Sequence, residues 1–424
     1  MSVPNTQAVR RRIDQQELDA ICARHDRLWQ AKPGGARAIL AWLDLSGLSL
    51  AGRNLADADF AAACLIGTDL TGAKLDNTTF FGADMQDCIL VDASMRRADL
   101  RGASLRGANL TGADLFEADL REGTIAAADS KLGFRVVEAK WRNDTQAQGA
   151  CLVGANLQRS KLTGVVAVAA DFTDAIMKEC KLVRANLKQA SFRGADLAGA
   201  DLSGADLTGA DLRDSILVGV KFAMWRTDGA DMTGALTDDR SVGAPVGKMP
   251  AAEMLADHAQ WCETDGTQGR PSVFDGVDLR ALRSIKGYNL TALSARGAVF
   301  YGLDMEGVQL QGAHLEDADL RSVNLKGADL RGARLARARL NGADMRGAQL
   351  GPLMLSADRL LPADLTGACL KGADLSGADL KRANLNDADL TRAILRGACL
   401  SQAEMIGTDT TSVRGLEIKS PPTP

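Results

Sequence analysis

An apolar residue recurs at every fifth position over three long stretches of the chain. Residues 191–212, SFRGADLAGADLSGADLTGADL, repeat this pattern almost without change. Apolar positions at the same spacing extend from Leu45 to Ile125, from Leu152 to Phe222 and from Leu290 to Met405. A small residue, usually Ala, lies two positions before most of them, and Asp or Asn commonly separates the two. The repeating unit is therefore a pentad.

A period of five fits neither an α-helix nor a straight strand. On a helix, successive apolar residues would scatter around the axis, and on a strand they would alternate between the two faces. Both the apolar and the small residue can point inward only if the backbone bends once in every pentad. Gly, Ser and Thr, which are frequent at the remaining positions, suit such bends. The pattern thus predicts an all-β solenoid.

Aromatic residues indicate how many bends complete one coil. Phe60 and Phe80 are 20 residues apart, as are Phe172 and Phe192. Because large side chains pack best on other large ones, these four residues are expected to stack in the core, with four pentads in each coil. At a strand spacing of about 4.8 Å, the first two stretches would make roughly eight coils and the third about six.

The A-[DN]-L-x-x pattern resembles the pentapeptide repeat family over roughly 56 pentads, about two-thirds of the chain. This resemblance implies a right-handed quadrilateral β-helix.

Two segments outside the repeats have the spacing of amphipathic helices. Their apolar stripes comprise Ile21, Cys22, His25, Leu28 and Trp29 in the first and Met254, Leu255, His258, Trp261 and Cys262 in the second. Asp14 and Glu17 have the spacing of a capping box at the start of the first helix. An open solenoid end exposes unpaired strand edges, so each helix is expected to cap the β-helix module that follows it.

These patterns divide the chain into two modules that arose by internal duplication. The repeat changes register by two between Ile125 and Leu152, which indicates an excursion. We expect an N-terminal helix and cap (1–44), a first β-helix (45–232) with an excursion at 126–150, a linker and second helical cap (233–289), a second β-helix (290–405) and a disordered C-terminal tail (406–424).

Composition argues against several functional classes. The net charge is −4 and the pI is about 5.6, so nothing in the overall balance favours nucleic acid or an acidic membrane. No apolar run is long enough to span a bilayer, and no signal peptide is recognised. The eight cysteines include no C-x-x-C pair, which is typical of reduced thiols in a cytoplasmic protein.

No catalytic motif is present in the sequence. His25 and His258 lie on the apolar stripes, where a packed structural histidine is favoured over a metal or catalytic role because no partner residue recurs beside them. His314 stands alone at an outward position and is interpreted as surface. The sequence therefore predicts a protein that is not an enzyme and needs no metal, cofactor or small-molecule substrate.

The periodic aspartates allow two interpretations. Asp196, Asp201, Asp206 and Asp211 can hydrogen-bond turn amides within their own coils. Alternatively, the resemblance to family members that protect DNA gyrase from quinolones implies a charge ladder that imitates DNA. Only residues 40–125, with a charge of about −6, could form such a face, and Asp84, Asp99, Asp114 and Asp119 are its candidates. B-DNA carries one charge per ~1.7 Å, a far denser array.

Four arginines crowd one half of a coil in the segment RGARLARARL. They are candidates for contact with an acidic partner, or they could pair with Asp319 or Asp344. The cluster consists of Arg331, Arg334, Arg337 and Arg339.

One irregularity interrupts the last stretch of repeats. Asp358 occupies a normally inward position between Pro352 and Pro362, and burial of an unpaired carboxylate is costly. We therefore expect residues 351–362 to bulge outward, as a tolerated insertion or as a binding site.

Taken together, these patterns favour a scaffold that presents rigid faces to an unidentified protein partner. The DNA-mimicking protein that binds gyrase or another DNA-binding protein remains the alternative. A direct nucleic-acid partner and membrane insertion are both disfavoured.

Overall fold

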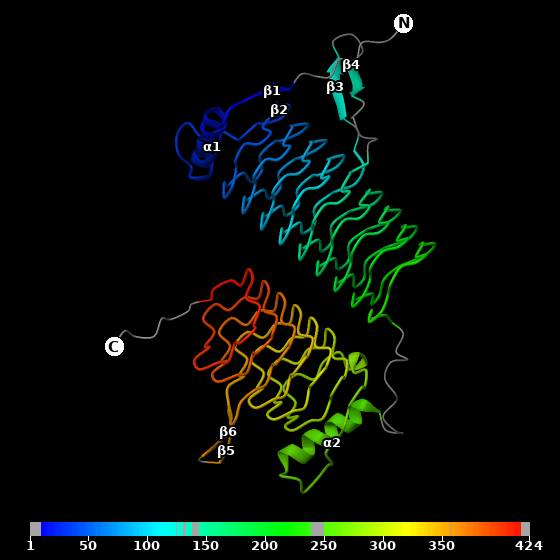
Figure 1. Cartoon of the computed structure of the whole chain (residues 1–424), viewed down its shortest axis with the longest axis vertical. Helices are drawn as coiled ribbons and strands as arrows, with labels where there is room; N and C mark the ends of the chain where they lie inside the picture. The colour runs from blue at the N-terminus through cyan, green and yellow to red at the C-terminus, as the bar shows by residue number, and fades with distance from the viewer. Residues whose placement is uncertain are drawn as a thin grey trace, which may run out of the picture. The chain divides into compact units, whose positions relative to one another are not determined.

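The computed structural model describes residues 10–123, 125–129, 133–137, 144–238, 250–356 and 358–416, with only the backbone described in 125–129 and 133–137. The chain forms two compact units, Met1–Asp238 and Asp239–Pro424. Each unit contains its own continuous hydrophobic core. Figure 1 shows that each is a stack of similar coils.

Each pentad makes one bend because its backbone closes a tight turn. In residues 191–212, the amide of Ala200 donates to the carbonyl of Leu197 at 2.9 Å, and the amide of Ala205 donates to the carbonyl of Leu202 in the same way. Gly199, the second corner residue of the first of these turns, has φ +69°, a conformation that glycine adopts without a Cβ penalty. The bend returns both Leu and Ala to the interior, where they are fully buried.

Four pentads complete one coil, as predicted from the phenylalanine spacing. Parallel bridges join residues 20 apart, such as Asp196 to Ile216. The Phe60 and Phe80 rings stack at 5.0 Å between centroids, and the Phe172 and Phe192 rings stack at 4.9 Å. The solenoid core is thus built from columns of inward residues 20 positions apart, and the phenylalanines lie next to each other within two of them.

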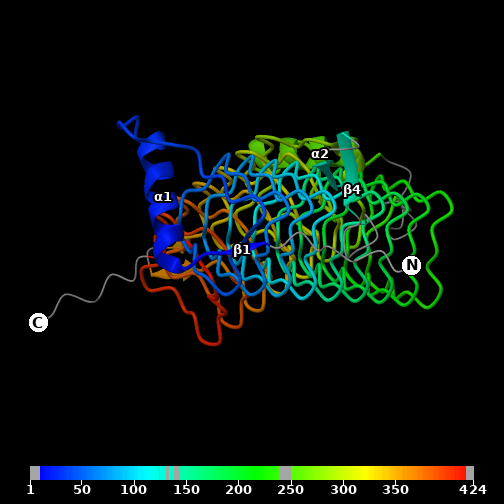
Figure 2. The same ribbon diagram turned by 90° about the horizontal axis from the view of Figure 1, so that it is seen from above.

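The N-terminal segment pairs with the first coil of unit 1. Strand β1 (Arg11–Arg12) runs parallel to β2 (Leu43–Asp44), and helix α1 (Gln15–Trp29) follows it. Figure 2 shows α1 lying across the end of the first coils. The side chain of Gln15 both accepts from the Ser49 amide and donates to its carbonyl, at 2.9 Å each. It takes the place that a neighbouring strand would occupy.

Only half of the predicted capping box forms. Asp14 accepts a hydrogen bond from the Glu17 amide at 2.8 Å. The Glu17 carboxylate does not return to the Asp14 amide but pairs with Arg11 at 2.6 Å, because β1 places that arginine within reach.

The excursion in unit 1 differs in extent from the predicted 126–150. Ile125 lies in β3 (Ile125–Asp129), which pairs antiparallel with β4 (Gly133–Val137), and is therefore not a coil position. The ladder resumes where Gln146 pairs with Ser104. Residues 145–150 belong to the coil, with buried Thr145 and Ala147 inside; the absence of Leu there concealed the repeat in the sequence.

The second β-helix begins before the predicted residue 290. Helix α2 (Ala251–Glu263) precedes it, and Val273 already pairs with Ser294. Phe274, Leu279 and Ile285 are buried, but the last two are six residues apart. A 3-10 turn, η1 (Arg280–Leu282), accommodates the extra residue that broke the period.

The ladders also extend beyond other predicted boundaries. In unit 1 they run from Ile39 to Leu236, outside the predicted 45–232. In unit 2 Ile394 pairs with Arg414, so residues 406–414 belong to the β-helix and not to the predicted tail. Of the rest of that tail, residues 417–424 lie outside the described residues.

The irregular segment 351–362 bulges outward, as predicted, in the form of an antiparallel hairpin. Strand β5 (Leu353–Ser356) pairs with β6 (Arg359–Leu361), and Asp358 is exposed. Leu355 and Leu360, counted as inward pentad positions in the sequence, are 49% and 39% exposed. The hairpin adds ten residues to one coil. Because ten residues are two whole pentads, the apolar positions after the hairpin keep the same five-residue spacing, and the sequence pattern did not reveal the insertion.

The stacked phenylalanines provide a test of the columns. Phe80→Ala is expected to reduce the free energy of unfolding by about 3–5 kcal/mol, because it leaves a cavity in a fully packed core. Phe80→Leu should cost less than half of that, since Leu100 fills the next position of the same column. Urea unfolding followed by circular dichroism measures both, and equal losses would show that the column is not packed as described.

Candidate interaction surface

The four candidate carboxylates of a DNA-mimicking face are engaged within the coils. Asp84 is 6% exposed and accepts a hydrogen bond from Gln86 Nε2 at 2.7 Å. The other three form ion pairs of 2.7–2.8 Å: Asp99 with Arg101, Asp114 with Arg96 and Asp119 with Arg121. Each negative charge therefore has a local polar or cationic neighbour, although the Asp99 and Asp114 side chains stay partly exposed.

The aspartate series of residues 196–211 confirms the structural interpretation of the repeat. The Oδ1 atoms of Asp196, Asp201, Asp206 and Asp211 each accept from the amide two residues ahead, at 3.0–3.1 Å. The Thr208 hydroxyl and amide hold the pKa of Asp206 below its usual value, with Lys188 adding to the effect, against a smaller upward shift from burial. These carboxylates stabilise their own turns.

The predicted arginine cluster is partly paired. Arg331 contacts Asp329 at 2.6 Å in its own coil, and Arg337 contacts Asp317 at 2.7 Å in the preceding coil. The predicted partners, Asp319 and Asp344, instead pair with Arg321 and Arg346, which follow them by two residues. Arg334 is exposed and lies in the ladder between His314 and Asp364, while Arg339 lies between Asp319 and Cys369.

Each helix places a buried histidine against the coil that follows. Nδ1 of His25 accepts a hydrogen bond from the Ala38 amide at 3.0 Å, and Nδ1 of His258 accepts from the Ser272 amide at the same distance. Nε2 of His258 donates to the Thr291 carbonyl at 3.1 Å. The two rings thus serve the same role in the two units, bridging helix and coil.

The environment of both histidines disfavours the charged form. Burial lowers the pKa of His25; a backbone hydrogen bond with Ala56 and the carboxylates of Asp26 and Asp57 act against this shift, and the Arg37 charge adds to it. Burial likewise lowers the pKa of His258, against the hydrogen bond with Thr291. A proton on Nδ1 would face an amide N–H in either unit, so protonation breaks the contact.

Two details depart from the sequence interpretation. Trp29 and Leu28 are 51% and 46% exposed, because α1 buries only Leu18, Cys22 and His25. The Trp29 indole still contacts the His25 ring, with Nε1 3.1 Å from Nε2. His314 is more than surface: its Nδ1 lies 2.5 Å from Arg296 and 3.6 Å from Glu316.

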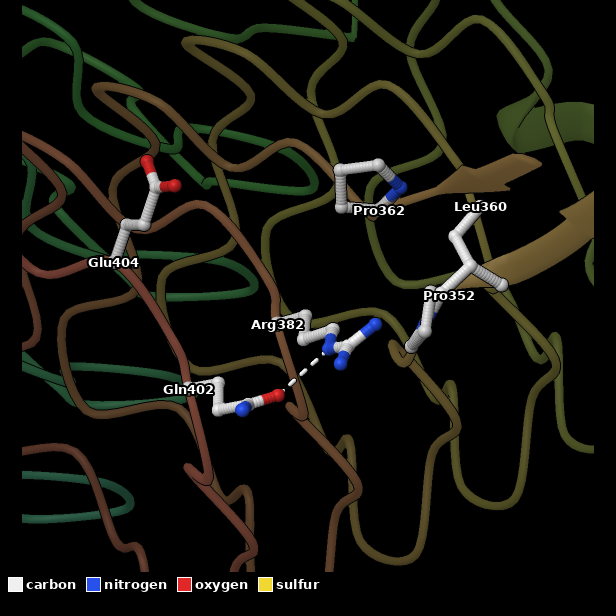
Figure 3. A pocket seen from close by; sticks show the side chains of 6 residues that line it. All are labelled: Pro352, Leu360, Pro362, Arg382, Gln402 and Glu404. Carbon is white, nitrogen blue, oxygen red and sulfur yellow. Dashed lines mark hydrogen bonds between the residues drawn. The ribbon is translucent and has the colours of Figure 1, made fainter. Parts of the chain in front are cut away.

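The hairpin of unit 2 borders a cleft that the sequence analysis did not predict. The cleft has a volume of about 410 Å³. Its wall consists of Pro352, Leu360 and Pro362, and Arg382, Gln402 and Glu404 line the opposite side. Figure 3 shows the Arg382 guanidinium lying between Gln402 and the two prolines. In the sequence, only the two prolines marked this region as irregular. Arg382, Gln402 and Glu404 lie in ordinary pentads, so nothing in the sequence connected them with the prolines.

Within the described ranges, His, Cys, Asp and Glu side chains form no group that could hold a metal ion. Among the same residues, neither helix has the length and apolar character needed to cross a bilayer.

A family model for pentapeptide repeats matches residues 38–123, 150–219, 318–351 and 363–409 in overlapping segments, more than half of the chain. The chain belongs to the pentapeptide repeat family. Its coils are those of the right-handed quadrilateral β-helix. No curated protein sequence matches the chain.

Several solved structures of the family resemble this pentapeptide repeat protein. Rfr23 from the cyanobacterium Cyanothece 51142 is 26% identical, with 32% of this chain and 91% of that chain covered and a TM-score of 0.21. QnrB1, a plasmid-mediated fluoroquinolone resistance protein, is 20% identical, with 46% and 92% covered and a TM-score of 0.29. HetL, involved in heterocyst differentiation regulation in Nostoc sp. strain PCC 7120, is 21% identical, with 92% and 93% covered and a TM-score of 0.12.

The buried histidines predict a pH dependence of stability. Because their folded pKa values lie below the ordinary value of about 6.5, the unfolded chain binds more protons as the pH falls through that value. The contribution of the neutral histidines to the free energy of unfolding is therefore complete above about pH 6.5. It decreases as the pH falls from there toward the pKa values of the folded protein. Urea midpoints measured between pH 8 and pH 5 should fall accordingly.

The control is the double variant His25→Asn, His258→Asn, whose Oδ1 can still accept from the two amides but does not titrate. Its urea midpoint should vary less with pH in this window. An unchanged slope would assign the dependence to other groups.

Proposed function

We propose that this pentapeptide repeat protein is a non-enzymatic interaction protein that presents its β-helix faces and the β5–β6 hairpin to a protein partner. Proteins of this family are generally non-enzymatic interaction proteins. The observation that carries the proposal is the hairpin: it exposes Met354, Leu355 and Leu360 beside a coil whose other Leu positions are buried. Exposed apolar patches on folded proteins commonly mark contact sites.

Helices α1 and α2 are proposed to cap their units and so keep the coils from stacking on other copies. Two groups of contacts support this role in unit 1: the pairing of β1 with β2, and the hydrogen bonds of Gln15 and His25 to the first coil. In unit 2, His258 and the Ser272 hydroxyl, which donates to the Met254 carbonyl at 2.9 Å, join helix to coil. A cytoplasmic location stays a prediction from cysteine usage.

The ion pairs of the acidic segment argue against the DNA-mimicking alternative. A mimic needs carboxylates that are free to meet a basic groove, whereas Asp99, Asp114 and Asp119 already contact arginines. Replacing those contacts by a partner would bring no net gain in charge pairing.

Affinity capture with the full chain from a lysate of its native host tests the choice. A partner bound through exposed apolar side chains should be retained at high salt, because salt screens charges but not apolar contacts. A bait carrying Met354→Ser and Leu355→Ser should lose that partner while its circular dichroism stays unchanged. Recovery of gyrase subunits that disappear at high salt would contradict the proposal and support DNA mimicry.

A further inference from the structure

The β5–β6 hairpin has a fixed seat on the β-helix. Where the hairpin is inserted, the two residues joined by a bridge are 30 apart instead of 20, as with Arg334 and Asp364. The coils on either side keep their pairing. Gly332, a corner residue of the preceding coil, lies directly under it. A Cβ on this glycine would stand 2.8 Å from Leu353 Cβ and 3.1 Å from Leu361 Cδ2. The hairpin therefore packs against one corner and is not a free loop.

The outer surface of the hairpin exposes three apolar side chains beside the polar Ser356, Asp358 and Arg359. Met354 is 70% exposed, and Leu355 and Leu360 are exposed beside it. Leu360 also contributes to the wall of the cleft, together with Pro352 and Pro362. The proline rings have a fixed φ, so little conformational entropy is lost when a ligand packs on this wall.

Arg382 supplies one positive charge to the cleft. Its Nε donates to Gln402 Oε1 at 2.7 Å, which fixes the direction of the guanidinium (Figure 3). Among the described residues, no acceptor is bonded to its Nη atoms, and the side chain is exposed. Glu404, which also lines the cleft, accepts from Asn386 Nδ2 at 3.3 Å. An oriented guanidinium with unused donors is suited to a carboxylate, which it can bind in a bidentate manner.

We propose that the hairpin and this cleft bind an extended segment of a partner protein in which an apolar side chain lies next to an Asp or Glu. The apolar side chain packs on Pro352, Leu360 and Pro362, and the carboxylate pairs with Arg382. The open shape of the cleft and the adjoining exposed strand suit a length of polypeptide. This inference rests on the proposed function and names the surface and chemistry through which it acts.

The test is selection of a random dodecapeptide library displayed on phage against the full chain, followed by fluorescence anisotropy with the selected peptides. The expected peptides combine an acidic residue with a neighbouring Leu, Ile, Phe or Trp. Arg382→Gln should weaken their binding at least tenfold, a change of about 1.4 kcal/mol that hydrogen bonds to a charged group readily supply. Arg184→Gln is the matched control, because Arg184 is also an exposed corner residue with positive φ.

A second pair of variants tests the position of the hairpin. Gly332→Ala inserts a Cβ against Leu353 and should displace the hairpin, with a loss of peptide binding. Gly347→Ala imposes the same strain, at φ +65° against +67°, but its Cβ would meet no atom within 4 Å. Binding should therefore persist in Gly347→Ala.

Three outcomes would overturn the inference. Peptides that bind wild type and Arg382→Gln equally would place recognition elsewhere and leave the proposed function standing. Failure to select any acidic and apolar peptide would refute the cleft as a peptide site, whereas the lysate capture judges the proposed function separately. If removal of residues 417–424 strengthens peptide binding, the occupant is the chain's own tail, in which Glu417 lies between Leu416 and Ile418.

Discussion

The whole structure depends on one hydrogen-bonded turn repeated in every pentad. Closing that turn forces a corner residue into the left-handed region, where most side chains are disfavoured by about 1–2 kcal/mol. Gly often occupies this corner, yet Asp174, Glu179, Arg184 and Gln189 adopt φ of 56–57° in successive pentads. Each of these residues also donates its amide to the carbonyl of the next coil at 2.9–3.0 Å. Bonds between coils thus hold a conformation that the isolated pentad would not favour.

In this fold the inward residues determine the shape of each coil, whereas the outward residues determine its surface chemistry. Inward positions hold one apolar residue of Leu to Phe size and one small residue, and in the interior coils of both units these are almost completely buried. In the last coils they are partly exposed, as at Phe222. Outward positions face no such restriction, and they carry aspartate, arginine, asparagine or isoleucine in the same column. Many of these charges form ion pairs with close neighbours: Arg101 pairs with Asp99 and Arg213 with Asp211, each two residues away. Surface composition alone therefore overstates the charge available to a partner.

The coil, its four sides and its core could be predicted from the sequence because period and side-chain size specify them directly. Boundaries were predicted less well wherever the inward residue was not Leu, as at Ala147, or where one residue was added, as between Leu279 and Ile285. The cleft could not be predicted, because Arg382 and Gln402 meet Pro352 only through stacking of coils that are distant in sequence. The pairing of Arg337 with Asp317, by contrast, could have been predicted from the 20-residue coil, because the two corners are 20 residues apart.

The side-chain amide of Gln15 makes the two hydrogen bonds to Ser49 that a residue of a preceding coil would make. This limits where such a protein can gain coils. A new coil placed between α1 and Ser49 would have to displace both hydrogen bonds of that side chain. A coil duplicated within the stack meets no such obstacle, since it finds the same backbone groups above and below as its parent did. Gene duplication can therefore lengthen the solenoid from its middle, while the terminal residues and their helix are inherited unchanged.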